Sequence, residues 1–144
     1  MRVFVPLFAE ELKAPALPIR PATLPIPTVG GDEQELSEYE ATVEASIRAL
    51  ELIRDHAGPY RRLVAAVDVE SADDTATREI TWDWVSAFLV DSADAEEDVL
   101  RACQATTQEE ADAAVESVLE HALEWYSPDE RIALARGLTN NAER

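Results

Sequence analysis

The sequence predicts an α+β protein: a ferredoxin-like βαββαβ two-layer sandwich with an extra C-terminal helix and a proline-rich segment between its first strand and first helix. Short stretches of alternating apolar residues indicate strands, and apolar residues at helical spacing indicate helices. Their order is β-α-β-β-α-α-β-α, which becomes the split βαβ pattern when the paired helices are merged and the last helix is set aside. The length of 144 residues fits a single domain, residues 1–144.

The chain opens with a strand pattern and continues into a proline-rich segment. In MRVFVPL, Val3, Val5 and Leu7 alternate with Phe4, which is typical of a strand. Residues 14–31 hold five of the eight prolines. Because proline lacks the backbone N–H that a helix needs, this segment is expected to be extended.

The most regular apolar periodicity predicts a long helix that begins near residue 32. Asp32 and Glu35 form the pattern of a capping box. The apolar positions at helical spacing are Leu36, Tyr39, Val43, Ile47, Leu50 and Ile53. Gly58 and Pro59 then end the helix.

Residues 61–71 and 80–92 predict an antiparallel hairpin, because both are rich in β-branched and aromatic side chains. We chose a register in which paired residue numbers sum to 151. It opposes Val67 with Trp84, and it places Trp82 on the same apolar face, where both rings serve as core residues.

The second face of this hairpin has an apolar centre, which a two-layer fold leaves in water. It consists of Val64, Ala66, Val85, Ala87 and Leu89. Apolar surface of this kind is usually covered. The candidates are the proline-rich segment, the C-terminal helix and a second copy of the protein, and the leading hypothesis is a homodimer packed sheet to sheet.

The last third of the chain predicts two short helices, a short strand at residues 123–126 and a final helix. Thr107 and Glu110 form a capping pattern for the second of these helices. The final helix has Ser127 as its N-cap and Gly137 at its end, and residues 138–144 are expected to fray. The first of the short helices, residues 95–105, has Asp94 and Glu97 in the same capping pattern.

Several stretches resemble a family of short acidic actinobacterial proteins that carries only a domain-of-unknown-function label. They are MRVFVPL, LPIRPATLPIPTV, ELSEYEATVEASIRALELI, RRLVAAVDV, VSAFLVDSADAEEDV and EHALEWYSPDE. The resemblance implies a cytoplasmic bacterial protein with an α+β fold. It implies no activity and no functional residues, because the family has none assigned.

The chain contains no recognisable catalytic motif, so the sequence favours a protein that is not an enzyme. The weak catalytic candidates are Asp68 and Asp83, which the chosen register places opposite each other. Two close carboxylates perturb each other's proton affinity. The alternative is that each lies in water at the sheet margin. Cys103 is expected to be a buried apolar thiol rather than a nucleophile.

No metal site and no cofactor are predicted. Two histidines without an HExxH or CxxC pattern do not make a zinc site. The acidic stretch DSADAEED lacks the twelve-residue calcium loop and its glycine. The four glycines form neither a phosphate loop nor a dinucleotide fingerprint.

Charge is the strongest functional clue in the sequence. The formal net charge is −18, and residues 91–130 contain thirteen acidic residues and one basic residue, Arg101. A charge of this sign opposes direct binding to nucleic acid and to anionic membranes. The residues Glu109, Asp112, Glu116 and Glu120 form a predicted helical stripe, called the acidic stripe below.

These observations lead to a main functional hypothesis and two alternatives. The main one is a cytoplasmic homodimeric interaction or regulatory protein whose acidic stripe binds a basic protein partner. The first alternative is an enzyme or small-ligand binder with a pocket between the sheet and the proline-rich segment, lined by Trp82, Trp84 or Tyr126. The second is a DNA mimic that inhibits a nucleic-acid-binding protein. The acidic stripe can also be a solubilising surface without a partner.

Overall fold

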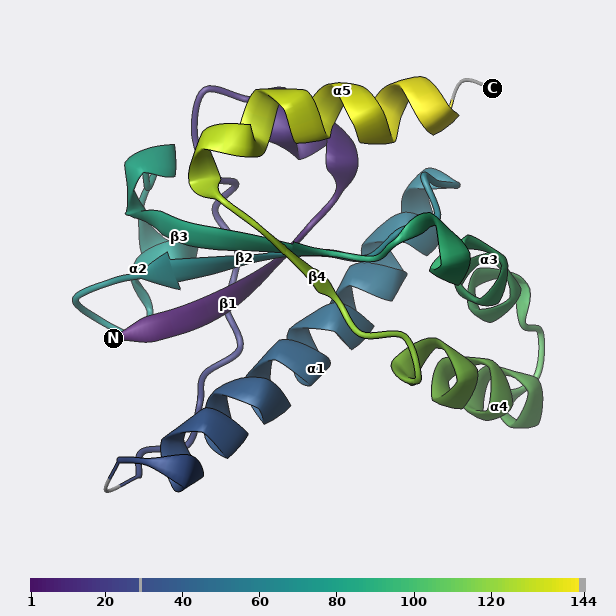
Figure 1. Ribbon diagram of the computed structural model, residues 1–144, viewed down its shortest axis with the longest axis horizontal. Coiled ribbons are helices and arrows are strands. Elements are labelled where there is room, and N and C mark those ends of the chain that lie inside the picture. Colours follow the sequence, from purple (N-terminus) through teal and green to yellow (C-terminus); the bar gives the residue numbers. More distant parts are fainter. Residues whose placement is uncertain (29, 143–144) are drawn as a thin grey trace.

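The described part of the chain contains one sheet of four antiparallel strands. A computed structural model describes residues 1–28 and 30–142, and it confirms the predicted α+β class (Figure 1). The strands are β1 (Arg2–Leu7), β2 (Leu63–Asp68), β3 (Val85–Val90) and β4 (Glu124–Tyr126). Their order in the sheet is β1-β2-β3-β4, so each strand pairs with its neighbours in the sequence.

Helices cover both faces of this sheet. Within the described residues they are α1 (Asp32–His56), α2 (Asp74–Thr77), α3 (Glu96–Gln104), α4 (Gln108–Leu119) and α5 (Arg131–Ala142). In Figure 1, α5 lies on one side of the sheet and α1 on the other, so the molecule has three layers rather than the predicted two. Among these helices, none combines the length and apolar character that crossing a membrane requires.

The ferredoxin-like topology is not confirmed, because each long connection contains one more reversal of the chain than predicted. In a βαβ unit, a single crossover helix connects two parallel strands. Here the proline-rich segment runs back along β1 before α1 begins, so β2 returns antiparallel to β1 as its direct neighbour. Two helices, α3 and α4, separate β3 from β4, which are antiparallel for the same reason.

The larger core lies between the sheet and α5. Ala65 of β2 and Phe88 of β3 point to this side, and Leu134 and Leu138 of α5 pack over them. Leu12, from a short 3-10 segment after β1, completes the cover. The C-terminal helix therefore holds the sheet from the side that the sequence identified as its main apolar face.

The second face of the sheet is buried beneath α1. Val64, Ala66 and Ala87 form a cluster with Ala41 and Ala45 of α1. The small alanine side chains let the helix approach the strands closely, which suits a face made of valine and alanine. The cover of this face is therefore α1 of the same chain, and not the proline-rich segment, the C-terminal helix or a second copy as predicted.

β2 and β3 pair two residues further along than predicted. Ala65 faces Phe88, so most paired residue numbers sum to 153. A shift of two keeps side chains on their predicted faces, because strand side chains alternate with a period of two. The exception is Val85, which an irregularity next to Val67 turns toward α5. Trp82–Trp84 forms a 3-10 turn before the strand and not part of it.

The proline-rich segment is extended, as predicted, and it covers the outer edge of β1. The N–H of Phe4 donates to the carbonyl of Thr23 at 3.0 Å, and the N–H of Thr23 donates to the carbonyl of Phe4 at 2.7 Å. Arg20 donates from Nη1 to the carbonyl of Pro6 at 2.8 Å. One edge of the sheet is therefore closed by the chain itself.

Helix ends differ from the predictions in three places. The N-cap of α3 is Ala95 without a side-chain cap, so the predicted pattern of Asp94 and Glu97 does not cap this helix. Gly31 is the N-cap of α1, without the side-chain cap that the Asp32 pattern indicated. Thr107 does cap α4, accepting from the N–H of Glu110 at 3.1 Å. α5 continues past Gly137 and buries Leu138, so part of the expected frayed tail is helical. The last two residues of that tail, 143–144, lie outside the described residues.

Candidate functional site

A pocket of about 340 Å³ opens between α1, β3 and the link that joins α4 to β4. This volume lies within the range of small-molecule and side-chain pockets, roughly 300–1,000 Å³. The lining residues are Tyr39, Thr42, Val43, Ser46, Arg62, Leu89, Leu119, Glu120, His121, Ala122 and Leu123. We call it the α1–α4 pocket.

A buried ion pair lies beside this pocket. Arg62 is 2% exposed and Asp91 is fully buried. The backbone N–H and the Nε of Arg62 both donate to Oδ2 of Asp91 at 2.8 Å, and Nη2 donates to Oδ1 at 2.7 Å. Nη1 donates to the hydroxyl of Ser46 in α1 at 3.1 Å. The carboxylate thus fixes the guanidinium in one orientation between the sheet and α1.

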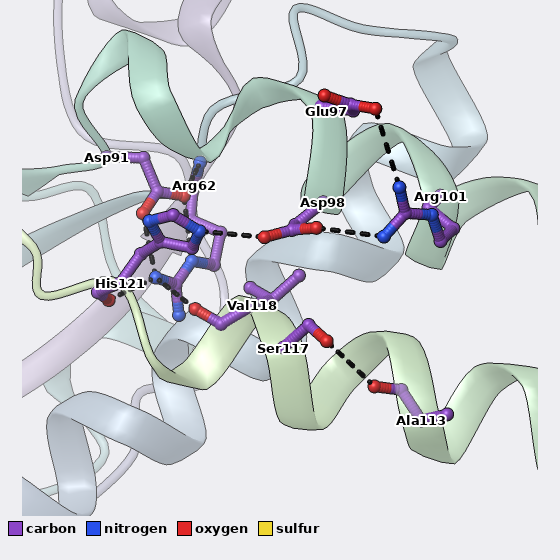
Figure 2. A network of polar contacts seen from close by, with 9 residues as sticks. All are labelled: Arg62, Asp91, Glu97, Asp98, Arg101, Ala113, Ser117, Val118 and His121. Atoms are coloured by element: carbon purple, nitrogen blue, oxygen red, sulfur yellow. Dashed lines mark hydrogen bonds and ion pairs between the residues drawn. The ribbon is translucent and has the colours of Figure 1, made fainter.

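Arg62 also forms hydrogen bonds with the segment at the end of α4 that lines one side of the pocket. Its Nη2 also donates to the carbonyls of Val118 at 3.3 Å and His121 at 2.9 Å, at the end of α4. Nε2 of His121 lies 2.8 Å from Oδ2 of Asp98 in α3, and Asp98 also pairs with Arg101 (Figure 2). The link between α4 and β4 is therefore tied to the sheet and to α3.

Exposed apolar side chains surround the pocket mouth. Tyr39 of α1 is 64% exposed and Leu119 of α4 is 38% exposed, and both line the pocket. Trp125 of β4 is 65% exposed and pairs with Leu89, another lining residue. Because paired residues point to the same face of a sheet, Trp125 lies on the pocket side of β4.

The acidic stripe leads to this mouth. All four of its carboxylates are exposed on α4 or just after it, and the last, Glu120, is a lining residue of the pocket. On α1, Glu35 lies four residues before Tyr39 and is therefore on the same side of the helix. Glu124 of β4 is also exposed, but it lies on the opposite side of the strand from Trp125 and from the pocket. The pocket lining is partly apolar, with Val43, Leu89 and Leu123, and Glu120 places a negative charge at its rim.

Sequence comparison assigns the chain to a family. A model described as a family of unknown function (DUF6912) matches residues 1–134. The chain belongs to this family. The predicted resemblance to a domain of unknown function is thereby confirmed, and no match was found among curated proteins or among solved structures.

In this DUF6912 protein, the two weak catalytic candidates are not paired. Asp68 forms an ion pair with Arg2 at 3.2 Å and is half exposed. Asp83 lies exposed in the 3-10 turn, and the ladder between β2 and β3 ends at Val67 and Val85. The shifted register therefore does not oppose the two carboxylates.

The residues predicted to mediate self-association lie inside the DUF6912 fold. Val64, Ala66, Val85 and Ala87 are buried, and Leu89 is half-buried in the α1–α4 pocket. A homodimer stays a prediction, but it has to use another surface than this face of the sheet.

Cys103 and Trp82, which the sequence predicts to be core residues, both pack against other parts of the fold. Cys103 of α3 packs between α1 and α4, and burial raises the pKa of its thiol, while the positive charge of Arg54 acts in the opposite direction. Trp82 packs against the larger core, and its Nε1 donates to the carbonyl of Ala14 at 2.8 Å. Neither residue lines the α1–α4 pocket.

Sequence reasoning missed Arg62 altogether. A signal was present, because Arg62 directly precedes one predicted strand core and Asp91 directly follows the next. In the observed register these two positions continue the ladder between β2 and β3, and the N–H of Asp91 donates to the carbonyl of Arg62 at 3.1 Å. Opposite charges at matching ends of two strands favour this register over the predicted one.

Proposed function

We propose that the protein is a small interaction protein that binds a basic segment of a partner protein at the α1–α4 pocket. This proposal rests on one observation, a pocket with apolar lining residues at the end of the acidic stripe. Such a site suits a segment with an apolar side chain that enters the pocket and with lysines or arginines that meet the rim. Burial of apolar surface supplies affinity, and the complementary charge supplies orientation and a fast encounter.

The charges inside and outside the pocket support a basic partner. The one arginine in the lining, Arg62, is engaged by Asp91 and by backbone carbonyls, so its charge is already compensated. Glu120 remains exposed at the rim. A partner with an acidic surface meets repulsion here, whereas a basic one is attracted.

Peptide binding tests this proposal. The probes are labelled synthetic peptides of equal length, one of lysine and leucine arranged as an amphipathic helix and one with glutamate in place of lysine. Fluorescence anisotropy is measured at low and at physiological salt. The basic peptide is expected to bind, more weakly at the higher salt, and the acidic peptide is expected not to bind.

Two matched pairs of variants locate the site. E116Q/E120Q removes two charges from the acidic stripe, and E70Q/E79Q removes two exposed charges elsewhere. Two surface charges contribute about 1 kcal/mol, so the first variant should bind roughly five-fold more weakly than the second. L119A, at the pocket, is compared with I132A, a similarly exposed residue of α5. Equal losses within each pair would contradict the proposed site.

Small-ligand binding is a second candidate function, and the pocket volume of about 340 Å³ favours it. A second pocket, of about 440 Å³, lies beside the proline-rich segment, where one was expected. Its lining includes Leu24 and Ile26 rather than the predicted Trp82, Trp84 or Tyr126. Ligand-detected NMR with a set of small neutral amides tests this candidate. Displacement of a bound amide by the basic peptide would show that both use the same pocket.

A further inference from the structure

We propose that the basic partner segment binds as an added β-strand on the free edge of β4, with an apolar side chain directed into the α1–α4 pocket. This inference rests on the proposed function and specifies the conformation of the partner. It also predicts the sequence pattern that the site selects, because the residues of a strand alternate between its two faces.

The two edges of the sheet differ. β1 is an edge strand whose backbone groups are met by Thr23 and Arg20. β4 is the other edge strand and pairs with β3 on one side only. In Figure 1 it crosses in front of the other strands. Among the backbone hydrogen bonds of the described residues outside the strands, none involves Glu124, Trp125 or Tyr126.

A free edge strand offers unpaired N–H and C=O groups to another extended chain, and proteins commonly cover such edges. The edge of β4 also carries Trp125, one of the most exposed large apolar side chains of the described residues. An exposed tryptophan next to unpaired backbone groups is the combination that strand addition uses, because the backbone supplies affinity and the ring supplies a contact surface.

The geometry of β4 sets the pattern of the added strand. Trp125 lies on the pocket side, opposite Leu89. Glu124 and Tyr126 therefore point to the other side, toward α5. Every second side chain of an added strand lies beside Trp125 and the pocket, and the others lie beside Glu124. A segment that alternates apolar and basic residues satisfies both sides.

Charge complementarity selects this occupant over a second copy of the chain. Exposed carboxylates stand on both sides of the edge, Glu120 on the pocket side and Glu124 on the other. Arg61 also lies near Tyr126, but its Nε donates to the carbonyl of Asp91 at 2.8 Å. Pairing β4 with itself would bring these carboxylates together in two chains of charge −18 each, whereas the lysines of an added strand would lie beside Glu124 and neutralise it.

A peptide of four Lys-Val repeats, acetylated and amidated at its ends, tests the proposal. Its matched control carries N-methyl groups on its central residues, which removes the backbone donors but keeps charge and side chains. The unmodified peptide is expected to bind at least five-fold more tightly. Trp125 and Ile132 are both exposed, so neither W125A nor I132A disturbs the core. W125A is expected to weaken binding of the peptide about five-fold, because it removes the ring beside the added strand. I132A, on α5, should leave the binding unchanged.

Amide hydrogen exchange gives the decisive readout. When the Lys-Val peptide saturates the protein, the outward N–H groups of β4 should exchange at least about ten-fold more slowly, because they have acquired acceptors. Unchanged β4 exchange with the peptide bound would overturn strand addition, and so would tighter binding of the helical lysine-leucine peptide. Both results leave the proposed function intact.

Two further outcomes separate the possibilities. Binding of neither basic peptide would refute the proposed function together with this inference. Light scattering should give the same mass for the wild-type protein alone and for W125A, because any homodimer is expected to use a surface other than the edge of β4. A doubled mass that W125A abolishes would show that a second copy, and not a basic segment, occupies the edge of β4.

Discussion

Replacing Asp91 by alanine should destabilise the protein strongly, because it leaves Arg62 charged and buried. The change removes the acceptors of three hydrogen bonds of 2.7–2.8 Å from an arginine that is 2% exposed. Removing one partner of a buried pair costs about 3–5 kcal/mol. The remaining acceptors, Ser46, Val118 and His121, are neutral and do not replace the carboxylate.

The double variant R62M/D91L distinguishes the cost of an unpaired charge from the value of the pair. It removes both charges and fills both positions with apolar side chains, so its loss should be smaller than that of D91A. The backbone N–H of residue 62 still loses its acceptor, and the carbonyls of Val118 and His121 lose a donor. Urea unfolding followed by circular dichroism measures both free energies. A loss below about 1 kcal/mol for D91A, or an equal loss in both variants, would refute this reasoning.

Three further predictions concern stability and reactivity. Phe88→Ala, at a fully buried site of the larger core, should cost about 3–5 kcal/mol in urea unfolding. The backbone N–H of Ser71 holds the pKa of Asp74 below its ordinary value. This stabilises the protein above the unfolded pKa and is lost as the pH falls through the folded pKa, so D74N should be less stable than wild type at neutral pH and converge with it in acid. Because burial raises the pKa of Cys103, iodoacetamide should alkylate the native thiol more slowly than the urea-unfolded one at neutral pH; equal rates would contradict this.

The helices and strands could be predicted from the sequence, but the way in which they connect could not. Apolar periodicity located the strands and the long helix, but the buried side of α1 differs from the predicted one. Leu50 and Ile53 are buried as the pattern implies, whereas Leu36, Tyr39 and Ile47 are exposed. Alanines of α1 face the sheet instead. The topology failed where two helices were merged into one. Each added element reverses the chain. Counting the proline-rich segment and both short helices as separate reversals therefore makes the two strands that each connection joins antiparallel, and they are direct neighbours in the sheet.

The negative charge of the candidate site could be predicted from the sequence, whereas the pocket itself could not. The acidic stripe follows from spacing on one helix, and its residues are exposed as a stripe requires. The pocket joins α1, β3 and the α4–β4 link, which are distant in sequence. Its position depends on how Arg62 ties these elements together, and that contact follows from the register of β2 and β3. In the predicted register, which differs by two residues, Arg62 and Asp91 are not opposite each other.

The closure of the β1 edge by Thr23 limits how large any assembly through the sheet can become. A sheet with two open ends can add strands indefinitely, as fibrils do. Here the edge of β1 is already met by the chain itself, so β4 is the edge at which a strand can be added to this sheet. The proline-rich segment thereby prevents open-ended growth of the sheet from the side opposite to β4.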